Sequence, residues 1–292
     1  MLNDSGLKLF GVIGHPIGHS LSPLMHNTAF EALGLHCSMQ ALDIRPESLH
    51  DAVQSFRVLG FGGVNVTVPH KERIMPFLDD IEAEARAIGA VNTIHFVEGK
   101  AIGYNTDAFG FRQSLEPYRS KIDGSIFAIL GAGGAARAVV YVLLKHFRST
   151  QIVIVSRSLT RSRDLIEQFK EIDQNRLTAI TFQDPALMSL LLSARLIVNA
   201  TPVGMHPQWH EFPIPPEFFH GEHVVFDLVY RPLKTKFLAG AEQRGATTVS
   251  GLEMFLHQGS RAFELWTGRQ MDLEAVRSTI LAFLQHEDAP PF

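Results

Sequence analysis

The chain has 292 residues, of which 46% are hydrophobic and 19% are charged, as in a globular protein of about two domains. Its net charge of −4 argues against a general nucleic-acid-binding protein, which needs a cationic face. The single cysteine, Cys37, excludes an intrachain disulfide. The first residues lack an apolar core of signal-peptide length, and no later run is long enough to cross a membrane. We therefore expect a cytoplasmic protein with no nucleic-acid or membrane partner.

Strand and helix patterns alternate along the chain, which predicts parallel α/β layers. In the first part the expected strands are 7–13, 38–44 and 62–68, the expected helices are 23–33, 46–59, 71–78 and 81–88, and a hairpin follows at 92–97 and 101–104. After a connecting helix and linker at 108–124, the expected strands are 126–130, 151–155, 178–181, 196–199, 224–227 and 247–249. Further helices are expected at 134–147, 252–266 and 273–285.

Residues 126–137 read I-F-A-I-L-G-A-G-G-A-A-R, a buried strand followed by the spacing of a dinucleotide-binding turn. Gly131 permits the tight turn, Gly133 lets the backbone approach a pyrophosphate, and Ala136 lets the next helix pack closely on the strand. The free N–H groups at the start of that helix point at the phosphates.

The segment after the next strand distinguishes between two cofactors. NAD-binding folds usually place an acid there to bind the ribose 2′-hydroxyl. Here residues 156–161 read S-R-S-L-T-R, with no carboxylate and two guanidinium groups that suit a phosphate. The sequence therefore predicts NADP rather than NAD, the alternative being a solvated turn before a helix.

These patterns predict an α/β fold of two domains. Residues 108–250 would form a central Rossmann NADP-binding domain, and residues 1–107 with the C-terminal helices, 251–292, would form the substrate-binding and catalytic domain. A cleft between the domains is the expected place for a small-molecule substrate. Four polar segments, 14–23, 65–71, 89–93 and 103–107, follow strands or turns of the first domain and are expected to converge on one pocket.

Those segments, the dinucleotide turn and the later stretches 199–205, 227–232 and 251–258 resemble the shikimate dehydrogenase family. S-x-S-P at 20–23, N-V-T-x-P-x-K at 65–71 and N-T-D at 105–107 are together far more specific than a Rossmann turn. The family reduces 3-dehydroshikimate to shikimate with NADPH in aromatic biosynthesis, and the resemblance implies this activity here. It also implies a substrate domain built from both chain ends around a central cofactor domain.

The resemblance makes Lys71 and Asp107 the catalytic pair. An ammonium near the carbonyl oxygen stabilises the charge that hydride transfer creates and supplies a proton, while a carboxylate orients the ammonium. Which of the two is the base during oxidation stays open, because coupled groups titrate together. Taken alone, Lys71 would be a surface lysine that opens a helix, and Asp107 a helix cap.

The resemblance also assigns the binding residues. The substrate carboxylate and ring hydroxyls would be bound by Ser20, Ser22, Thr67, Asn92, Tyr230 and Gln258, with the cap of the helix after Pro23 as an alternative role for Ser22. The cofactor would be bound by Gly131, Ala132, Gly133, Gly134 and Ala135 at the pyrophosphate, by Ser156, Arg157, Ser158 and Arg161 at the adenosine phosphate, and by Thr201, Leu228, Gly251 and Met254 near the nicotinamide. The family commonly has asparagine and threonine where Ser156 and Ser158 stand, and Leu228 and Met254 suit a core role equally.

Several alternatives compete with this interpretation. The pairs His15/His19 and His206/His210 have a metal-ligand spacing, but the prolines that follow His15 and His206 disfavour a helix there, so no metal is expected. A quinate/shikimate dehydrogenase that uses NAD would share the fold and the catalytic pair. An S-adenosylmethionine-dependent methyltransferase and a non-catalytic NADPH-binding sensor are further alternatives, which the Lys71 and Asp107 motifs disfavour. The sequence leaves monomer and homodimer open.

Overall fold

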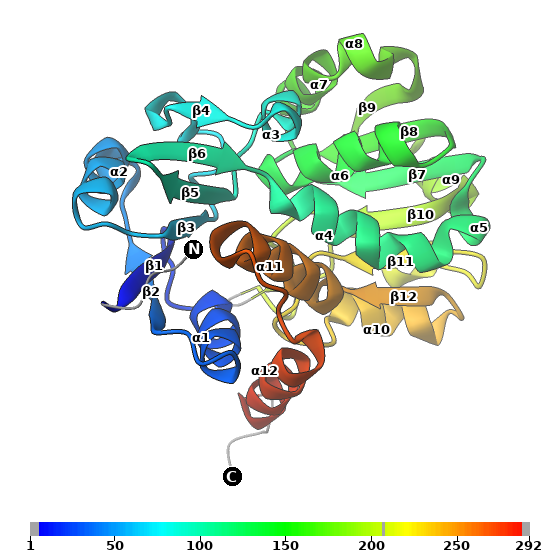
Figure 1. Ribbon diagram of the computed structural model, residues 1–292. Coiled ribbons are helices and arrows are strands. Elements are labelled where there is room, and N and C mark those ends of the chain that lie inside the picture. Colours follow the sequence, from blue (N-terminus) through cyan, green and yellow to red (C-terminus); the bar gives the residue numbers. More distant parts are fainter. Residues whose placement is uncertain (1–5, 206–207, 288–292) are drawn as a thin grey trace. The chain divides into compact units, whose positions relative to one another are not determined.

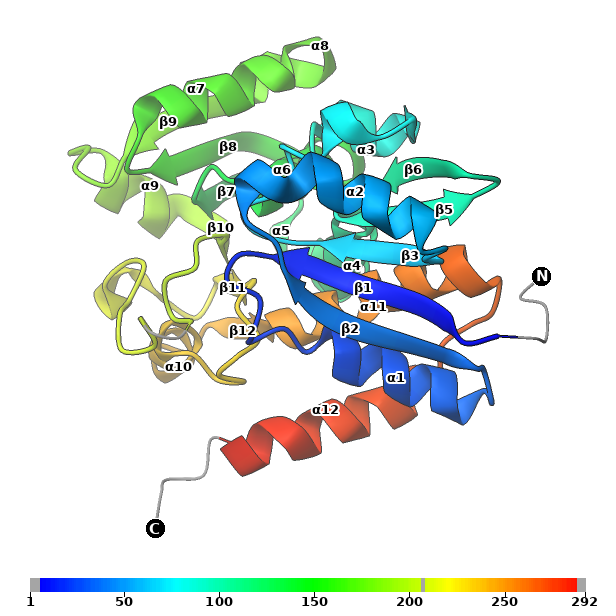
Figure 2. The same ribbon diagram turned by 90° about the vertical axis from the view of Figure 1, so that its left-hand side faces the viewer.

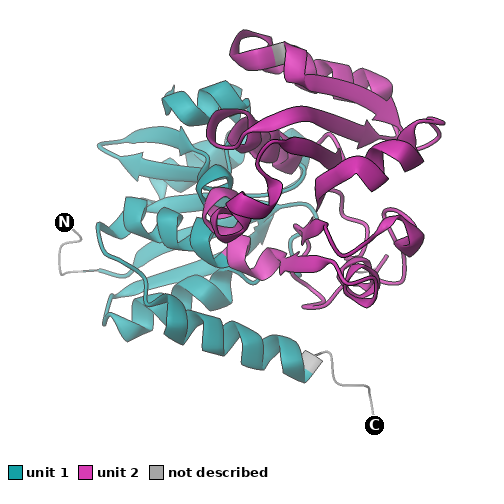
Figure 3. Ribbon diagram, turned by 90° about the vertical axis from the view of Figure 1, so that its right-hand side faces the viewer, with its two compact units in different colours: residues 1–109, 256–292 teal, residues 110–255 magenta. Residues whose placement is uncertain are grey.

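A computed structural model describes residues 6–205 and 208–287, which divide into two compact units. Unit 1 contains the residues up to Phe109 together with those from Leu256 onward, and unit 2 is Gly110–Phe255 (Figure 3). The breaks fall inside helices α4 (Thr106–Leu115) and α11 (Gly251–Thr267), a few residues from the expected boundaries at 107 and 251. No helix in the described ranges is long and apolar enough to cross a membrane.

The sheet of unit 1 brings four chain segments to one edge. Its strand order is β2-β1-β3-β5-β6-β4, with β1, β2 and β3 parallel and β5 antiparallel to both of its neighbours. Thr93, at the start of β5, pairs with Asn65 near the end of β3 and with Tyr104 at the end of β6. The exits of β1, β3 and β6 and the entry of β5 therefore meet. The strands are β1 (Lys8–Gly14), β2 (Cys37–Asp43), β3 (Gly63–Val66), β4 (Asp80–Ile81), β5 (Thr93–Val97) and β6 (Lys100–Tyr104).

Helices cover both faces of this sheet, α2 and α3 on one and α1, α11 and α12 on the other (Figure 2). On the second face an aromatic cluster joins Phe10 of β1, Phe30 of α1 and Trp266 of α11. The Trp266 indole Nε1 donates to the carbonyl of Ile94, at 3.0 Å. The helical segments are α1 (Ser22–Ala32), η1 (Pro46–Ser48), α2 (Leu49–Val58), η2 (Met75–Phe77), α3 (Ala83–Ile88) and α12 (Leu273–Glu287).

Two expectations for unit 1 were wrong. Residues 71–78 do not form an α-helix but turns followed by the 3₁₀ helix η2. Pro76 lacks the N–H that an α-helix would donate there, which accounts for the difference. The expected helix 81–88 is shorter, because the short strand β4 precedes it and the Glu82 side chain caps α3 at the N–H groups of Glu84 and Ala85.

Unit 2 contains a fully parallel sheet in the order β12-β11-β10-β7-β8-β9, the doubly wound order of a Rossmann fold. The chain reverses direction across the sheet between β7 and β10, where such folds bind dinucleotides. The expected α/β class with a Rossmann-like domain is thus confirmed. The strands are β7 (Ser125–Leu130), β8 (Ser149–Ser156), β9 (Leu177–Thr181), β10 (Ala194–Asn199), β11 (Val224–Asp227) and β12 (Thr247–Ser250).

Both faces of the second sheet are buried, which explains its continuous apolar strands. Ala128 and Leu130 belong to a core cluster with residues of α9 and α10, whereas Phe226 of β11 contacts Phe111 of α4 at 5.0 Å between ring centroids. Figure 1 shows α4 and α6 along the same face of this sheet. The other helical segments are η3 (Glu116–Tyr118), α5 (Arg119–Ile122), α6 (Gly134–His146), α7 (Leu159–Gln168), α8 (Lys170–Asp173), η4 (Gln174–Arg176), α9 (Leu187–Ser193), η5 (Pro216–Phe218) and α10 (Lys236–Gln243).

Candidate active site

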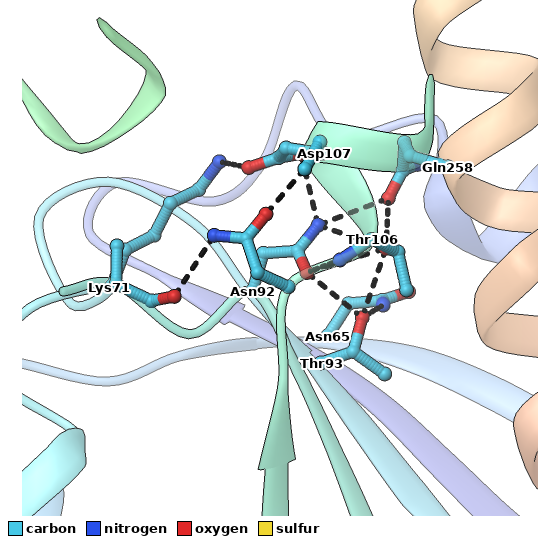
Figure 4. Close-up of polar contacts among 10 residues, drawn as sticks. Asn65, Lys71, Asn92, Thr93, Thr106, Asp107 and Gln258 are labelled. Atoms are coloured by element: carbon cyan, nitrogen blue, oxygen red, sulfur yellow. Dashed lines mark hydrogen bonds and ion pairs between the residues drawn. The ribbon is translucent and has the colours of Figure 1, made fainter. Parts of the chain in front are cut away.

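Lys71 and Asp107 form an ion pair within unit 1, with 2.6 Å between Nζ and Oδ2 (Figure 4). The two side chains are 13% and 7% exposed, so this is not a surface lysine. Asp107 lies in the first turn of α4 and does not cap it, because the Asn105 side chain accepts the N–H of Ala108. The carboxylate is therefore free of a capping role and faces the ammonium.

The turn that carries Lys71 is fixed by hydrogen bonds to its neighbours. The Lys71 carbonyl accepts the N–H of Val91 at 2.8 Å, and the His70 N–H donates to Thr67 at the same distance. The His70 ring is buried and its Nε2 lies 2.7 Å from the Ile44 carbonyl. The lysine thus extends toward Asp107 from a backbone anchored on both sides, and the ring of the neighbouring histidine faces Ile44, directly after β2.

Asn92 connects the ion pair to a buried polar network. Its amide nitrogen donates to Asp107 Oδ1 at 2.9 Å and to Thr106 Oγ1 at 3.0 Å, with Gln258 Oε1 a weaker contact at 3.4 Å. Its oxygen accepts the Thr106 N–H at 2.7 Å. Both carboxylate oxygens of Asp107 are therefore hydrogen-bonded, one to Lys71 and one to Asn92, which fixes the plane of the carboxylate (Figure 4).

Three residues of this network were not among the predicted site residues. Thr106 exchanges hydrogen bonds with Asn92, Thr93 donates to the Asn92 Oδ1 at 3.2 Å, and Asn65 donates to Thr93 at 3.2 Å. The Asn65 Oδ1 is also buried. A signal for all three was present, because Asn65, Thr93 and Thr106 lie in the polar segments 65–71, 89–93 and 103–107 that were expected to converge on one pocket.

The residues predicted to bind the carboxylate are divided between the units, with Ser20 and Ser22 in unit 1 and Tyr230 in unit 2. Ser20 Oγ accepts the N–H of Ser22 at 3.3 Å, and α1 begins at Ser22 with no side-chain cap, so the proposed capping role of Ser22 was wrong. A Cβ at Gly14 would lie 2.7 Å from the Thr67 methyl, which shows how closely the exits of β1 and β3 approach. Tyr230 belongs to unit 2, where its ring stacks on Phe255 with 4.4 Å between centroids.

The dinucleotide turn has the expected backbone. Gly131 has φ of +113°, and a Cβ there would lie 3.0 Å from the Ala200 carbonyl oxygen. Both the backbone conformation and the lack of room for a side chain therefore require glycine. A Cβ at Gly133 would meet nothing within 4 Å, and Ala136 is fully buried. Gly134 and Ala135 form the first turn of α6, whose N–H groups have no side-chain cap.

A hollow of about 230 Å³ in unit 2 combines the turn with the predicted phosphate site. Arg157 and Arg161 are exposed at its wall, and its described lining contains no carboxylate. Ser156 bonds to Ser162 at 2.7 Å, and Ser158 caps α7 at the Arg161 N–H, so both hydroxyls shape the turn that presents the arginines. The lining also includes Phe182, which the sequence did not indicate; it consists of Gly131, Ala132, Gly133, Ser156, Arg157, Ser158, Arg161, Phe182 and Thr201.

The residues expected near the nicotinamide lie at three places in unit 2. Leu228 and Gly251 are adjacent, because a Cβ at Gly251 would lie 2.4 Å from the Leu228 carbonyl oxygen. Thr201 lines the hollow on the neighbouring strand exit. Met254 is 7% exposed, as a core residue is. Of the histidine pairs, His206 lies outside the described residues, and no group of three potential metal ligands occurs among the described ones.

Comparisons with known proteins cover nearly the whole chain. Residues 12–94 match the shikimate dehydrogenase substrate binding domain, residues 251–281 match the shikimate 5′-dehydrogenase C-terminal domain, and residues 127–210 match the NADP binding domain of saccharopine dehydrogenase. A shikimate dehydrogenase (NADP⁺) of Methanopyrus kandleri is 44% identical over 97% of this chain and 98% of its own length.

Solved structures agree in fold. Shikimate 5-dehydrogenase from Thermus thermophilus, in complex with NADP(H) and shikimate, is 40% identical with a TM-score of 0.82 over 94% of this chain and 99% of that one. Quinate dehydrogenase from Corynebacterium glutamicum, in complex with NAD, has a TM-score of 0.86 at 29% identity, over 95% of this chain and 100% of that one.

Proposed function

Because the chain belongs to the shikimate dehydrogenase family, we propose that it catalyses the reversible NADPH-dependent reduction of 3-dehydroshikimate to shikimate, a step of aromatic amino acid and chorismate biosynthesis. The observation that carries the proposal is the buried pair of Lys71 and Asp107, 2.6 Å apart, with its carboxylate fixed by Asn92. An ammonium held in this way is suited to a carbonyl oxygen that becomes negatively charged.

The chemistry follows from that pair. NADPH supplies the hydride to the carbonyl carbon. The Lys71 ammonium stabilises the developing alkoxide and donates the proton that completes the hydroxyl. Asp107 compensates the charge of the ammonium and directs its N–H groups. In the oxidation direction the same pair takes up the hydroxyl proton.

We assign the substrate to unit 1. Ser20 and Ser22, with Tyr230, would bind the carboxylate through directed hydroxyl donors, and Thr67, Asn92 and Gln258 would bind ring hydroxyls. The support is that Asn92 and Gln258 share the network of Asp107, and that Gly14, at the exit of β1, lies against Thr67. Unit 2 would hold the cofactor.

The residues of unit 2 fit NADP. The open space at Gly133 and the uncapped first turn of α6, at Gly134 and Ala135, suit the pyrophosphate. Arg157 and Arg161 suit the 2′-phosphate, and a wall without a carboxylate does not repel it. The remaining assignments are Gly131, Ala132, Ser156 and Ser158 to the phosphates and Thr201, Leu228, Gly251 and Met254 to the nicotinamide. We place the reaction in the cytoplasm, by a monomer or homodimer.

An NAD-dependent quinate dehydrogenase, a methyltransferase and a non-catalytic NADPH sensor are not favoured by these relatives. Steady-state oxidation of shikimate and of quinate, each with NADP and with NAD, tests the proposal. We expect kcat/KM to be highest for shikimate with NADP. Turnover of quinate with NAD at an equal or higher kcat/KM would contradict it, as would NADP binding without turnover of either substrate.

A further inference from the structure

Two polar side chains are fully buried at the carboxyl ends of two neighbouring strands of the second sheet. Asn199 ends β10 and Asp227 ends β11, and they face each other in the register of the two parallel strands. Asn199 Nδ2 donates to Asp227 Oδ1 at 2.9 Å. Both strands are otherwise almost wholly buried and apolar, so a carboxylate and an amide placed there need a specific reason.

Asn199 fixes the turn that leads to the cofactor hollow. Its Oδ1 accepts both the N–H and the Oγ1 hydroxyl of Thr201, at 3.0 and 2.6 Å, and its Nδ2 also donates to the Val203 carbonyl at 3.0 Å. With the bond to Asp227, the amide is saturated. Thr201 is the residue of this turn that lines the hollow, and Asn199 determines where it lies.

Asp227 fixes the segment that follows β11. Its Oδ1 accepts the Val229 N–H at 3.0 Å, and its Oδ2 accepts the Thr235 hydroxyl at 2.6 Å. Thr235 in turn caps α10 by accepting the Leu238 N–H. One carboxylate thereby holds residues 228–235 at both ends, and Leu228, beside Gly251, is the first residue of that segment.

We propose that Asn199 and Asp227 are positioning residues for NADP, which they do not contact: their shared hydrogen bonds set the places of Thr201 and Leu228 on the nicotinamide side of the cofactor. This proposal rests on the proposed function, since it requires NADP to bind unit 2. The catalytic pair, Lys71 and Asp107, belongs to the other unit.

The charge on Asp227 gives the proposal a distinctive readout. Burial raises the pKa of this carboxyl to about 7, although the hydrogen bonds from Thr235, Val229 and Asn199 oppose the rise. No charged side chain of the described residues contributes to this change in the pKa of Asp227. Lys234, on the same segment, pairs with Glu242 instead. Only the ionised carboxylate accepts all three hydrogen bonds, so both loops are held best above pH 7.

The test is a titration of NADP into the full chain without substrate, from pH 6 to pH 8, for the wild type and Asp227→Asn. We expect the variant to bind NADP on the order of tenfold more weakly at pH 8, the usual effect of losing hydrogen bonds to a charged group. We also expect the difference in affinity between the two proteins to shrink toward pH 6. The 2′-phosphate and the other titrating groups contribute to both profiles and cancel in that difference.

Thr235→Val and Thr235→Ser form a matched pair: the first removes the hydroxyl and the second retains it. We expect weakened NADP binding in the first and near wild-type binding in the second, and an unchanged KM for shikimate in both. Equal NADP affinity in wild type and Asp227→Asn at every pH would overturn the proposal, as would equal losses in the two Thr235 variants. Because no substrate is present in the titration, failure of the positioning role is distinguishable from failure to turn over shikimate.

Discussion

The contact between Gly63 and Trp266 offers a sharp test of how helix α11 supports the site. A Cβ on Gly63 would lie 2.1 Å from Nε1 and 2.4 Å from Cε2 of the indole, far inside van der Waals contact. The indole is rigid, 5% exposed and bonded to the Ile94 carbonyl, so it has no free direction in which to move. In Gly63→Ala either β3 or α11 must therefore shift.

The expected cost of Gly63→Ala follows from two contributions. Overpacking of a tight core costs about 1–3 kcal/mol, and loss of the indole hydrogen bond costs about 1 kcal/mol more, so we expect a loss of roughly 2–4 kcal/mol in the free energy of unfolding. Since α11 also carries Gln258, two turns before Trp266, we expect weaker shikimate binding.

Urea unfolding measures the loss, and Gly6→Ala is the matched control, because a Cβ at Gly6 meets nothing within 4 Å. Combining Gly63→Ala with Trp266→Phe should cost less than the sum of the single changes, because the smaller ring relieves the overlap. Wild-type stability of Gly63→Ala would refute this reasoning, and so would strict additivity with Trp266→Phe.

Two further predictions concern unit 2. The pKa of Asp227 is about 7 in the folded chain against an ordinary value of 3.8, so its contribution to stability is present below pH 3.8 and is lost as the pH rises to about 7. From pH 5 to pH 8, the free energy of unfolding of Asp227→Asn, measured in urea, should rise by up to about 3 kcal/mol relative to that of the wild type. The same difference between the two proteins at both pH values would contradict the raised pKa. Replacing Arg157 and Arg161 together by alanine should raise the KM for NADP by at least tenfold and leave that for NAD within about threefold, since each guanidinium offers a charge-assisted bond to the 2′-phosphate. Equal effects on the two cofactors would exclude phosphate recognition by these arginines.

Local patterns predicted the convergence of the candidate site. The motif residues Lys71, Asn92 and Asp107 stood at strand exits and entries, and parallel or hairpin pairing necessarily brings such ends to one edge of a sheet. Strand positions were predictable for a related reason, because a strand buried on both faces is a nearly continuous apolar run.

Other features depend on tertiary contacts that a pattern does not encode. The turn at 71–78 has helical composition, yet Pro76 and the bond from Val91 to the Lys71 carbonyl favour turns and a 3₁₀ helix. Ser22 resembles a helix cap before proline but begins the helix itself. The partnership of Asn199 with Asp227 depends on the register of two strands that are separated by 24 residues of chain, from Ala200 to His223.

The central claim is that the Lys71 and Asp107 pair carries the proton of the reaction, with the Lys71 ammonium as donor in the reduction direction, and kcat for shikimate oxidation with NADP in Lys71→Ala tests it most directly. Arg73→Ala is the control, because it removes an exposed cation from the same turn. General acid–base groups contribute about 10²–10⁴ in rate, so we expect a loss of that size in Lys71→Ala, with NADP affinity unchanged and Arg73→Ala close to wild type. A kcat for Lys71→Ala within a few-fold of wild type would contradict the account.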